Sequence, residues 1–167
     1  MKVLLKNVRL SFPSLFKTEQ YAGEDTEKYA ATFLIPKSDT KTVASIEQAC
    51  KQALVEKYGE GKVPKGFKMP LVDGDDKEYQ GYADCVCIKA NTKKRPTLVN
   101  RDKTPIVEED GILYGGCYVN ASIDVWVMDN SYGKKVLASL NVIQFVKDGE
   151  AFGTKSEGAE CFEDLDD

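Results

Sequence analysis

Residues 118–128 (YVNASIDVWVM) alternate between apolar and polar side chains, which is the two-residue period of a β-strand with one buried face. The face that must point to a core consists of Val119, Ala121, Ile123, Val125 and Val127. The polar face consists of Tyr118, Asn120, Ser122, Asp124 and Trp126. Residues 129–133 (DNSYG) then form a hairpin signal, and a second long strand is expected over residues 136–146. This stretch predicts a mainly β fold.

The rest of the chain adds shorter strands and one helix. Strand patterns cover residues 3–10, 29–35, 82–90 and 97–99, while residues 12–28 and 61–78 are expected to be long loops. Residues 40–58 follow the helical period, with Ser38 or Asp39 as the cap and Gly59 as the stop. Many strands with one amphipathic helix indicate a small barrel or an α+β fold.

Composition excludes several kinds of chemistry. The 167 residues include no histidine, so Ser–His and Cys–His nucleophile pairs and His-ligated zinc are excluded. The five cysteines lack framework spacing, which indicates free thiols in a reducing cytoplasm. Cys85 and Cys87 are expected to be buried in a strand, and we expect neither a metal nor a cofactor. No stretch is apolar and long enough to span a membrane, and the start does not resemble a signal peptide.

The last thirteen residues, 155–167 (KSEGAECFEDLDD), contain six carboxylates and one lysine. Without them, 22 of the 23 basic and 21 of the 27 acidic residues remain, so the body of the chain is nearly neutral. We therefore predict one domain over residues 1–154 and a disordered acidic tail over residues 155–167. A tethered polyanion of this kind predicts a cationic surface on the body. The residues expected to bind a partner are Glu157, Glu160, Phe162, Glu163, Asp164, Asp166 and Asp167.

The best candidate for that cationic surface is the segment 81–103, with the run 91–96 (NTKKRP) as a tight connection between two strands. Mobile cations at a rim suit phosphate binding, although charge alone favours a solvated loop. Its basic residues are Lys89, Lys93, Lys94, Arg95, Arg101 and Lys103.

Aromatic rings strengthen the case for a nucleic-acid surface. Tyr118 and Trp126 stand on the polar strand face, Tyr82 lies beside the basic segment, and Phe16 lies in the first long loop. Stacking of a base on an exposed ring contributes about 1–3 kcal/mol and tolerates any sequence. Two interpretations remain open for Trp126: it stacks on bases, or a loop or the helix covers it.

Several motifs carry a family resemblance. Residues 93–102 (KKRPTLVNRD), 108–111 (EEDG), 113–122 (LYGGCYVNAS) and 139–153 (SLNVIQFVKDGEAFG) resemble a family of single-stranded DNA-binding proteins of tailed bacteriophages and prophages. The likeness covers nearly the whole chain. It implies an OB-fold, a five-stranded barrel with one helix, which binds DNA through a basic, aromatic groove in the cytoplasm of the bacterial host.

The same resemblance implies roles for the tail and a set of partners. Related acidic tails recruit the replicative polymerase and the primase-helicase and suppress unproductive binding, and the family is compatible with a homodimer. Such tails commonly finish on an aromatic residue, whereas here Asp167 is last and Phe162 lies five positions inside.

The leading hypothesis is a non-enzymatic, sequence-non-specific single-stranded DNA-binding protein that protects single strands during phage DNA replication and recombination. Three alternatives stay open. One is a module that prefers RNA or duplex. Another is a metal-dependent nuclease built on Asp73, Asp75 and Asp76 or on residues 108–110, which their turn-like context disfavours. The last is an interaction protein whose tail mimics DNA.

Overall fold

The computed structural model describes residues 1–152 of the chain. The predicted acidic tail lies outside these residues, and so do its predicted partner-binding residues Glu157, Glu160, Phe162, Glu163, Asp164, Asp166 and Asp167. The predicted boundary between domain and tail, after residue 154, also lies outside the described residues.

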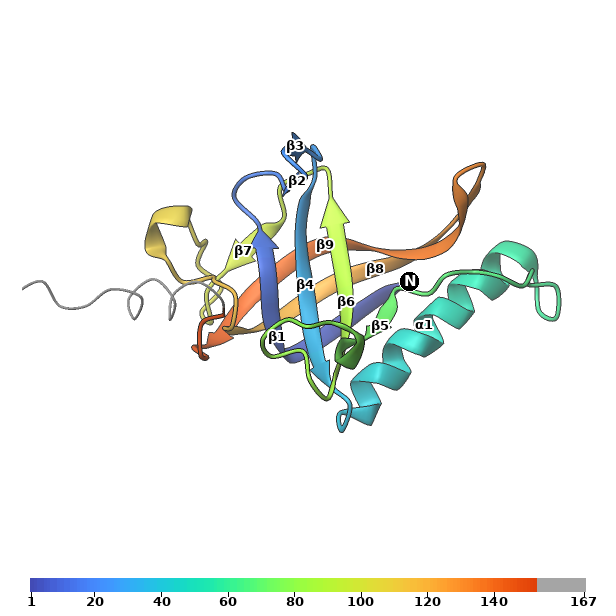
Figure 1. Ribbon diagram of the computed structural model, residues 1–167, viewed down its shortest axis with the longest axis horizontal. Coiled ribbons are helices and arrows are strands. Elements are labelled where there is room, and N and C mark those ends of the chain that lie inside the picture. The colour runs from blue at the N-terminus through green and yellow to red at the C-terminus, as the bar shows by residue number, and fades with distance from the viewer. Residues whose placement is uncertain (153–167) are drawn as a thin grey trace, which may run out of the picture.

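Five long strands close into a ring (Figure 1). They are β1 (Lys2–Ser14), β4 (Tyr29–Pro36), β6 (Cys85–Thr92), β8 (Tyr118–Asn130) and β9 (Gly133–Lys147). Antiparallel pairing runs in the order β6-β4-β1-β8-β9, and a parallel pairing of β6 with β9 at Asn91 and Ser139 completes the circle. This arrangement confirms the predicted fold class, a mainly β five-stranded barrel with one amphipathic helix and long loops.

The β8–β9 hairpin has the structure that its alternating pattern predicts. Along β8 the apolar side chains from Val119 to Val125 are buried and Val127 is half-buried, while the polar ones are half-buried until Trp126 becomes exposed. The two strands pair from Val119 opposite Phe145 to Asn130 opposite Gly133, with a bulge that leaves Asn141 without a partner residue. Because β8 keeps its alternation through this bulge, its apolar face stays on the core throughout.

The helix α1 (Thr40–Tyr58) has the predicted bounds and packs on β1 and β8. Asp39 caps it, since one carboxylate oxygen accepts a hydrogen bond from the Thr42 amide at 3.3 Å and the other accepts one from the Thr42 hydroxyl at 2.7 Å. Gly59 ends it with φ of 97°. The face toward the barrel buries Ile46, Ala49, Cys50 and Leu54.

The two long loops contain more structure than the sequence predicts. Residues 12–28 include the end of β1 and a small hairpin of β2 (Gln20–Tyr21) and β3 (Glu24–Asp25). Residues 61–78 include β5 (Leu71–Asp73), which pairs with β6, and the 3₁₀ turn η1 (Gly74–Asp76).

Smaller elements complete the chain. β7 (Thr97–Val99) has its predicted bounds and pairs with β9, and η2 (Glu108–Asp110) follows it. β6 begins at Cys85 rather than at Tyr82, because Asp84 has a left-handed φ of 60° and its amide donates to Asp75. No helix within residues 1–152 has the length and apolar character to cross a membrane.

Candidate functional site

A groove of about 640 Å³ crosses the outer face of β4 and β6. One wall is the β2–β3 hairpin, another is the start of β9, and a third is the segment of residues 68–82. Hairpin loops that flank the outer face of a barrel are where OB-folds bind oligonucleotides. The lining residues are Phe12, Glu19, Gln20, Tyr21, Thr32, Lys68, Met69, Pro70, Val72, Lys77, Tyr79, Tyr82, Cys87, Lys89, Asn91, Lys135, Val136 and Leu137.

Large apolar side chains are exposed along this groove. Phe12, Tyr21 and Tyr79 are 55%, 74% and 54% exposed, and Met69 lies beside them. The centroids of the Phe12 and Tyr79 rings are 5.0 Å apart, and those of Tyr79 and Tyr82 are 5.2 Å apart. Rings that are held against one another yet open on one side can accept a flat, unpaired base.

The charge of the groove is positive. Among residues 1–152, its lining includes four lysines, Lys68, Lys77, Lys89 and Lys135, and one carboxylate, Glu19. Glu19 forms an ion pair with Lys89, whose ammonium lies 2.8 Å and 2.9 Å from the two carboxylate oxygens. Ammonium groups beside exposed rings suit a ligand with phosphates and bases.

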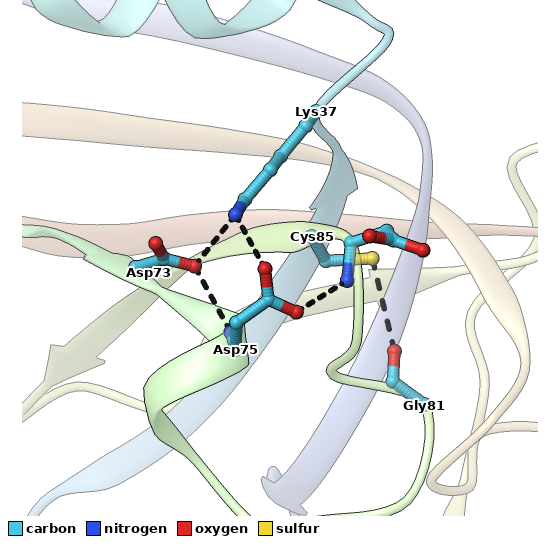
Figure 2. Close-up of polar contacts among 6 residues, drawn as sticks. Lys37, Asp73, Asp75, Gly81 and Cys85 are labelled. Carbon is cyan, nitrogen blue, oxygen red and sulfur yellow. Dashed lines mark hydrogen bonds and ion pairs between the residues drawn. The ribbon is translucent and has the colours of Figure 1, made fainter.

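A cluster of polar contacts holds one wall of the groove in place (Figure 2). Lys37, just after β4, places its ammonium 2.9 Å from Asp73 and 2.6 Å from Asp75. The other oxygen of Asp75 accepts a hydrogen bond from the Asp84 amide at 2.8 Å. We call Lys37, Asp73, Asp75 and Asp84 the polar clamp. It joins the two ends of the segment 74–84, which includes Lys77, Tyr79 and Tyr82.

The clamp also shifts the pKa values of its charged side chains. Hydrogen bonds from Lys37 lower the pKa of both Asp73 and Asp75, and hydrogen bonds to Asp75 and Asp73 raise the pKa of Lys37. All three groups therefore stay charged across the neutral range. Gly74 lies in the same turn. Only glycine fits there, because a Cβ would lie 2.2 Å from the carbonyl oxygen of Tyr82.

Tyr82 corrects one sequence prediction. Expected as a base-stacking ring, it is only 3% exposed, and its hydroxyl shares a hydrogen bond of 2.8 Å with Ser11. Burial raises its pKa. It packs with Leu34 and Cys87, and Phe152 covers the same small cluster. Tyr82 therefore supports the rings of Phe12 and Tyr79 from beneath instead of presenting its own face.

Phe152, the last residue that the structure describes, lies close to this wall. A Cβ on Gly81 would lie 2.5 Å from its ring, and the guanidinium of Arg9 lies 4.2 Å from the ring centroid. Arg9 in turn donates hydrogen bonds to the carbonyl oxygens of Gly116 at 3.0 Å and Glu150 at 2.6 Å.

The predicted basic segment is divided in the structure. Lys89 lines the groove, whereas the other five predicted cations do not. Lys93 and Lys94 are exposed on the connection between β6 and β7, and the guanidinium of Arg95 lies 5.7 Å from the ring centroid of Phe16. Arg101 and Lys103 are exposed in the turn after β7. β7 leaves β6 to pair with β9, and the five other cations of the segment lie outside the groove.

The two predicted rings of β8 have different surroundings. Tyr118 is half-buried between Arg9 and Lys147, whose cationic groups lie 5.6 Å and 4.8 Å from its ring centroid. Trp126 is 42% exposed and lies opposite Leu137, which lines the groove. Full coverage of Trp126 by a loop or the helix is thereby excluded.

Sequence reasoning missed most of the lining, including the lysines and large side chains Lys68, Met69, Lys77, Tyr79 and Lys135. Four of these five lie in residues 61–80, a polar stretch that has no periodic pattern. The backbone of Lys68 reaches β9 by accepting from the Val136 amide at 2.9 Å and donating to the Lys134 carbonyl at 3.0 Å. The local signal that the sequence offers for this surface is an aromatic residue, Tyr79, two positions after Lys77.

Comparison with known proteins gives a consistent result. The chain is 42% identical to the putative protein p50 of Acyrthosiphon pisum secondary endosymbiont phage 1, over 99% of this chain and 94% of that protein. The single-stranded DNA-binding protein from bacteriophage Enc34, solved in complex with ssDNA, superposes with a TM-score of 0.78 at 27% identity, covering 91% of this chain and 89% of that one.

The single-stranded DNA-binding protein gp2.5 of bacteriophage T7 shares the fold, with a TM-score of 0.62 at 15% identity over 99% of this chain and 96% of that one. The family model of the Enterobacter phage Enc34 ssDNA-binding protein matches residues 1–167. This chain therefore belongs to the Enc34 family of phage single-stranded DNA-binding proteins.

Proposed function

We propose that this protein binds single-stranded DNA without sequence specificity along the groove on β4 and β6, and that it protects single strands during phage DNA replication and recombination. The observation that carries this proposal is the presence of exposed Phe12, Tyr21 and Tyr79 beside four lysines in one groove. Every base has a flat face that such rings can accept, and the lysines can follow the phosphates.

We further propose that the bound strand runs beyond the groove. Asn91 lines the groove, and Lys93, Lys94 and Arg95 follow it directly, with Phe16 beneath Arg95. Trp126 lies opposite Leu137, which also lines the groove. Arg101, Lys103 and Tyr118 lie outside the groove, and we propose that they contact the strand beyond it.

We propose no enzymatic role. The strongest acidic candidate for a nuclease centre was the cluster of Asp73, Asp75 and Asp76. Asp73 and Asp75 are engaged by Lys37, which leaves them supporting the groove wall.

The acidic tail of residues 155–167 is proposed to compete with DNA for the groove and to recruit phage replication proteins, namely the polymerase and the primase-helicase. Its composition supports this role, and so does its point of departure, because the preceding Phe152 packs against Gly81 in the groove wall. A short tether keeps the local concentration of such a competitor high.

A titration with labelled oligothymidylate at several salt concentrations tests the proposal. With about four to six phosphate contacts, the logarithm of the binding constant should fall with the logarithm of salt at a slope between about −3 and −4. Emission of Trp126, the one tryptophan of the chain, should be quenched in parallel. Matched RNA and duplex should compete poorly. A binding constant that does not change with salt concentration, or tighter binding to duplex than to single strands, would contradict the proposal.

A further inference from the structure

The ion pair between Glu19 and Lys89 lies in the path that a bound strand would follow. Lys89 lies on β6 in the floor of the groove, opposite Thr32 of the neighbouring strand β4. Glu19 belongs to the wall, and its side chain is 21% exposed against 49% for Lys89. The ammonium of Lys89 donates hydrogen bonds to both oxygens of the Glu19 carboxylate, at 2.8 Å and 2.9 Å.

The backbone of Glu19 is fixed, so its carboxylate does not reach the groove by chance. Its amide donates to the Lys28 carbonyl at 2.7 Å, and its carbonyl accepts from both the amide and the hydroxyl of Thr26 at 2.9 Å. These bonds close the base of the β2–β3 hairpin. The remaining acids of the hairpin, Glu24, Asp25 and Glu27, do not line the groove.

A carboxylate in this position resembles a phosphate in charge and in its hydrogen-bond acceptors. As long as Glu19 holds Lys89, the pair adds no net charge to the groove. A backbone phosphate that approaches Lys89 meets an ammonium that is already neutralised and a like charge beside it. The strand must therefore exchange places with Glu19 to use this cation.

We propose that Glu19 is an internal competitor for DNA, which neutralises Lys89 in the empty groove and is displaced by a backbone phosphate on binding. This inference rests on the proposed single-strand binding along the groove. The competitor acts within the barrel domain and is distinct from the acidic tail, because Glu19 and Lys89 both belong to residues 1–152 and contact each other directly.

The substitution Glu19→Gln tests the proposal, because glutamine keeps the shape and an acceptor for Lys89 while removing the charge. Affinity for labelled oligothymidylate should rise about three- to tenfold at low salt. The slope of log affinity against log salt should steepen by about 0.7, the value for one further neutralised phosphate on a single strand. Glu24→Gln is the matched control, since it removes the same charge from the same hairpin outside the groove.

A second pair of variants separates charge competition from a structural role. Lys89→Gln leaves Glu19 unpaired in the groove and should weaken binding, whereas Lys89→Gln combined with Glu19→Gln restores neutrality and should recover affinity toward that of the unchanged protein. A merely structural ion pair would instead make the double variant as weak as the single one.

The outcomes are distinct. Tighter binding and a steeper slope for Glu19→Gln, with Glu24→Gln unchanged, support the competitor. Unchanged or weaker binding for Glu19→Gln, or an equal gain for Glu24→Gln, overturns it while the proposed function stands. If the unchanged protein itself fails to bind oligothymidylate, the proposed function is wrong and the competitor falls with it.

Discussion

Tyr21 and Tyr79 reach the groove from different elements, the β2–β3 hairpin and the segment that follows η1. Each exposes more than half of its surface although tyrosine rings gain free energy from burial. Exposed rings that gather in one groove, with lysines between them, are better explained by a flat ligand than by the fold itself.

Replacing Tyr79 or Tyr21 with alanine should weaken single-strand binding by about 1–3 kcal/mol, because each variant loses one stacking ring. Fluorescence anisotropy of a labelled oligothymidylate measures the change. Leu4→Ala serves as the control, since Leu4 is 62% exposed and lies outside the groove. Unaltered affinity for both tyrosine variants would remove these rings from the binding surface.

Tyr58 links the stability of the fold to pH at the end of α1. Its hydroxyl donates to Asp129 at 2.6 Å, which joins the end of α1 to the hairpin, and this hydrogen bond raises the pKa of Tyr58 from 10 to about 12. Because the folded pKa is the higher one, the stabilisation is complete below pH 10 and is lost as the pH rises through about 12. In an ultraviolet titration of phenolate, Tyr58→Phe should remove one group that titrates near pH 12. A titration curve that loses a group near pH 10 instead would contradict this assignment.

At the scale of elements, the wall that includes Tyr79 depends on the polar clamp. Asp75→Asn removes the charge that holds Lys37 and weakens the acceptor for the Asp84 amide, so the segment 74–84 should loosen. We expect single-strand affinity to fall about two- to fivefold, with little change in the far-ultraviolet circular dichroism of the barrel.

Asp76→Asn is the control for this clamp variant, because Asp76 is exposed in the same turn and lies outside the clamp. Equal losses for the two variants would show that net charge, and not the position of the wall, sets the affinity. The clamp carboxylates have lowered pKa values, so their stabilisation persists above about pH 4 and disappears as the pH falls further.

Elements whose signals are local could be predicted from the sequence. The 3.6-residue period and the flanking Asp39 and Gly59 were sufficient for α1, and strict alternation was sufficient for β8. The groove walls could not be predicted, because they depend on partners far apart in the chain, such as Lys37 with Asp75 or Lys68 with β9. The predicted site was correspondingly incomplete: it included Lys89 but missed Lys77 and Tyr79.

The nearly neutral body and the acidic tail of residues 155–167 are proposed to oppose each other in DNA binding. Removing residues 155–167 should tighten single-strand binding by about tenfold at low salt, because a tethered polyanion no longer occupies the groove. The gain should shrink as salt screens the competition, and contact with the replication partner should weaken.

A full-length variant with amides in place of the six tail carboxylates is the appropriate control, since it keeps chain length and removes charge. It should bind single strands as tightly as the deletion does. Equal or weaker binding after deletion would refute the competing tail, and it would leave the groove proposal intact.

Within residues 1–152, the edges of the barrel sheet meet at one aligned residue pair, Asn91 with Ser139, which makes that line a seam. Asn91 and Leu137 lie on either side of it, and both line the groove. A strand seated there would cross the seam and contact both margins. Bound DNA would then oppose local separation of β6 from β9. Amide hydrogens along this line should therefore exchange more slowly in the complex than in the free protein.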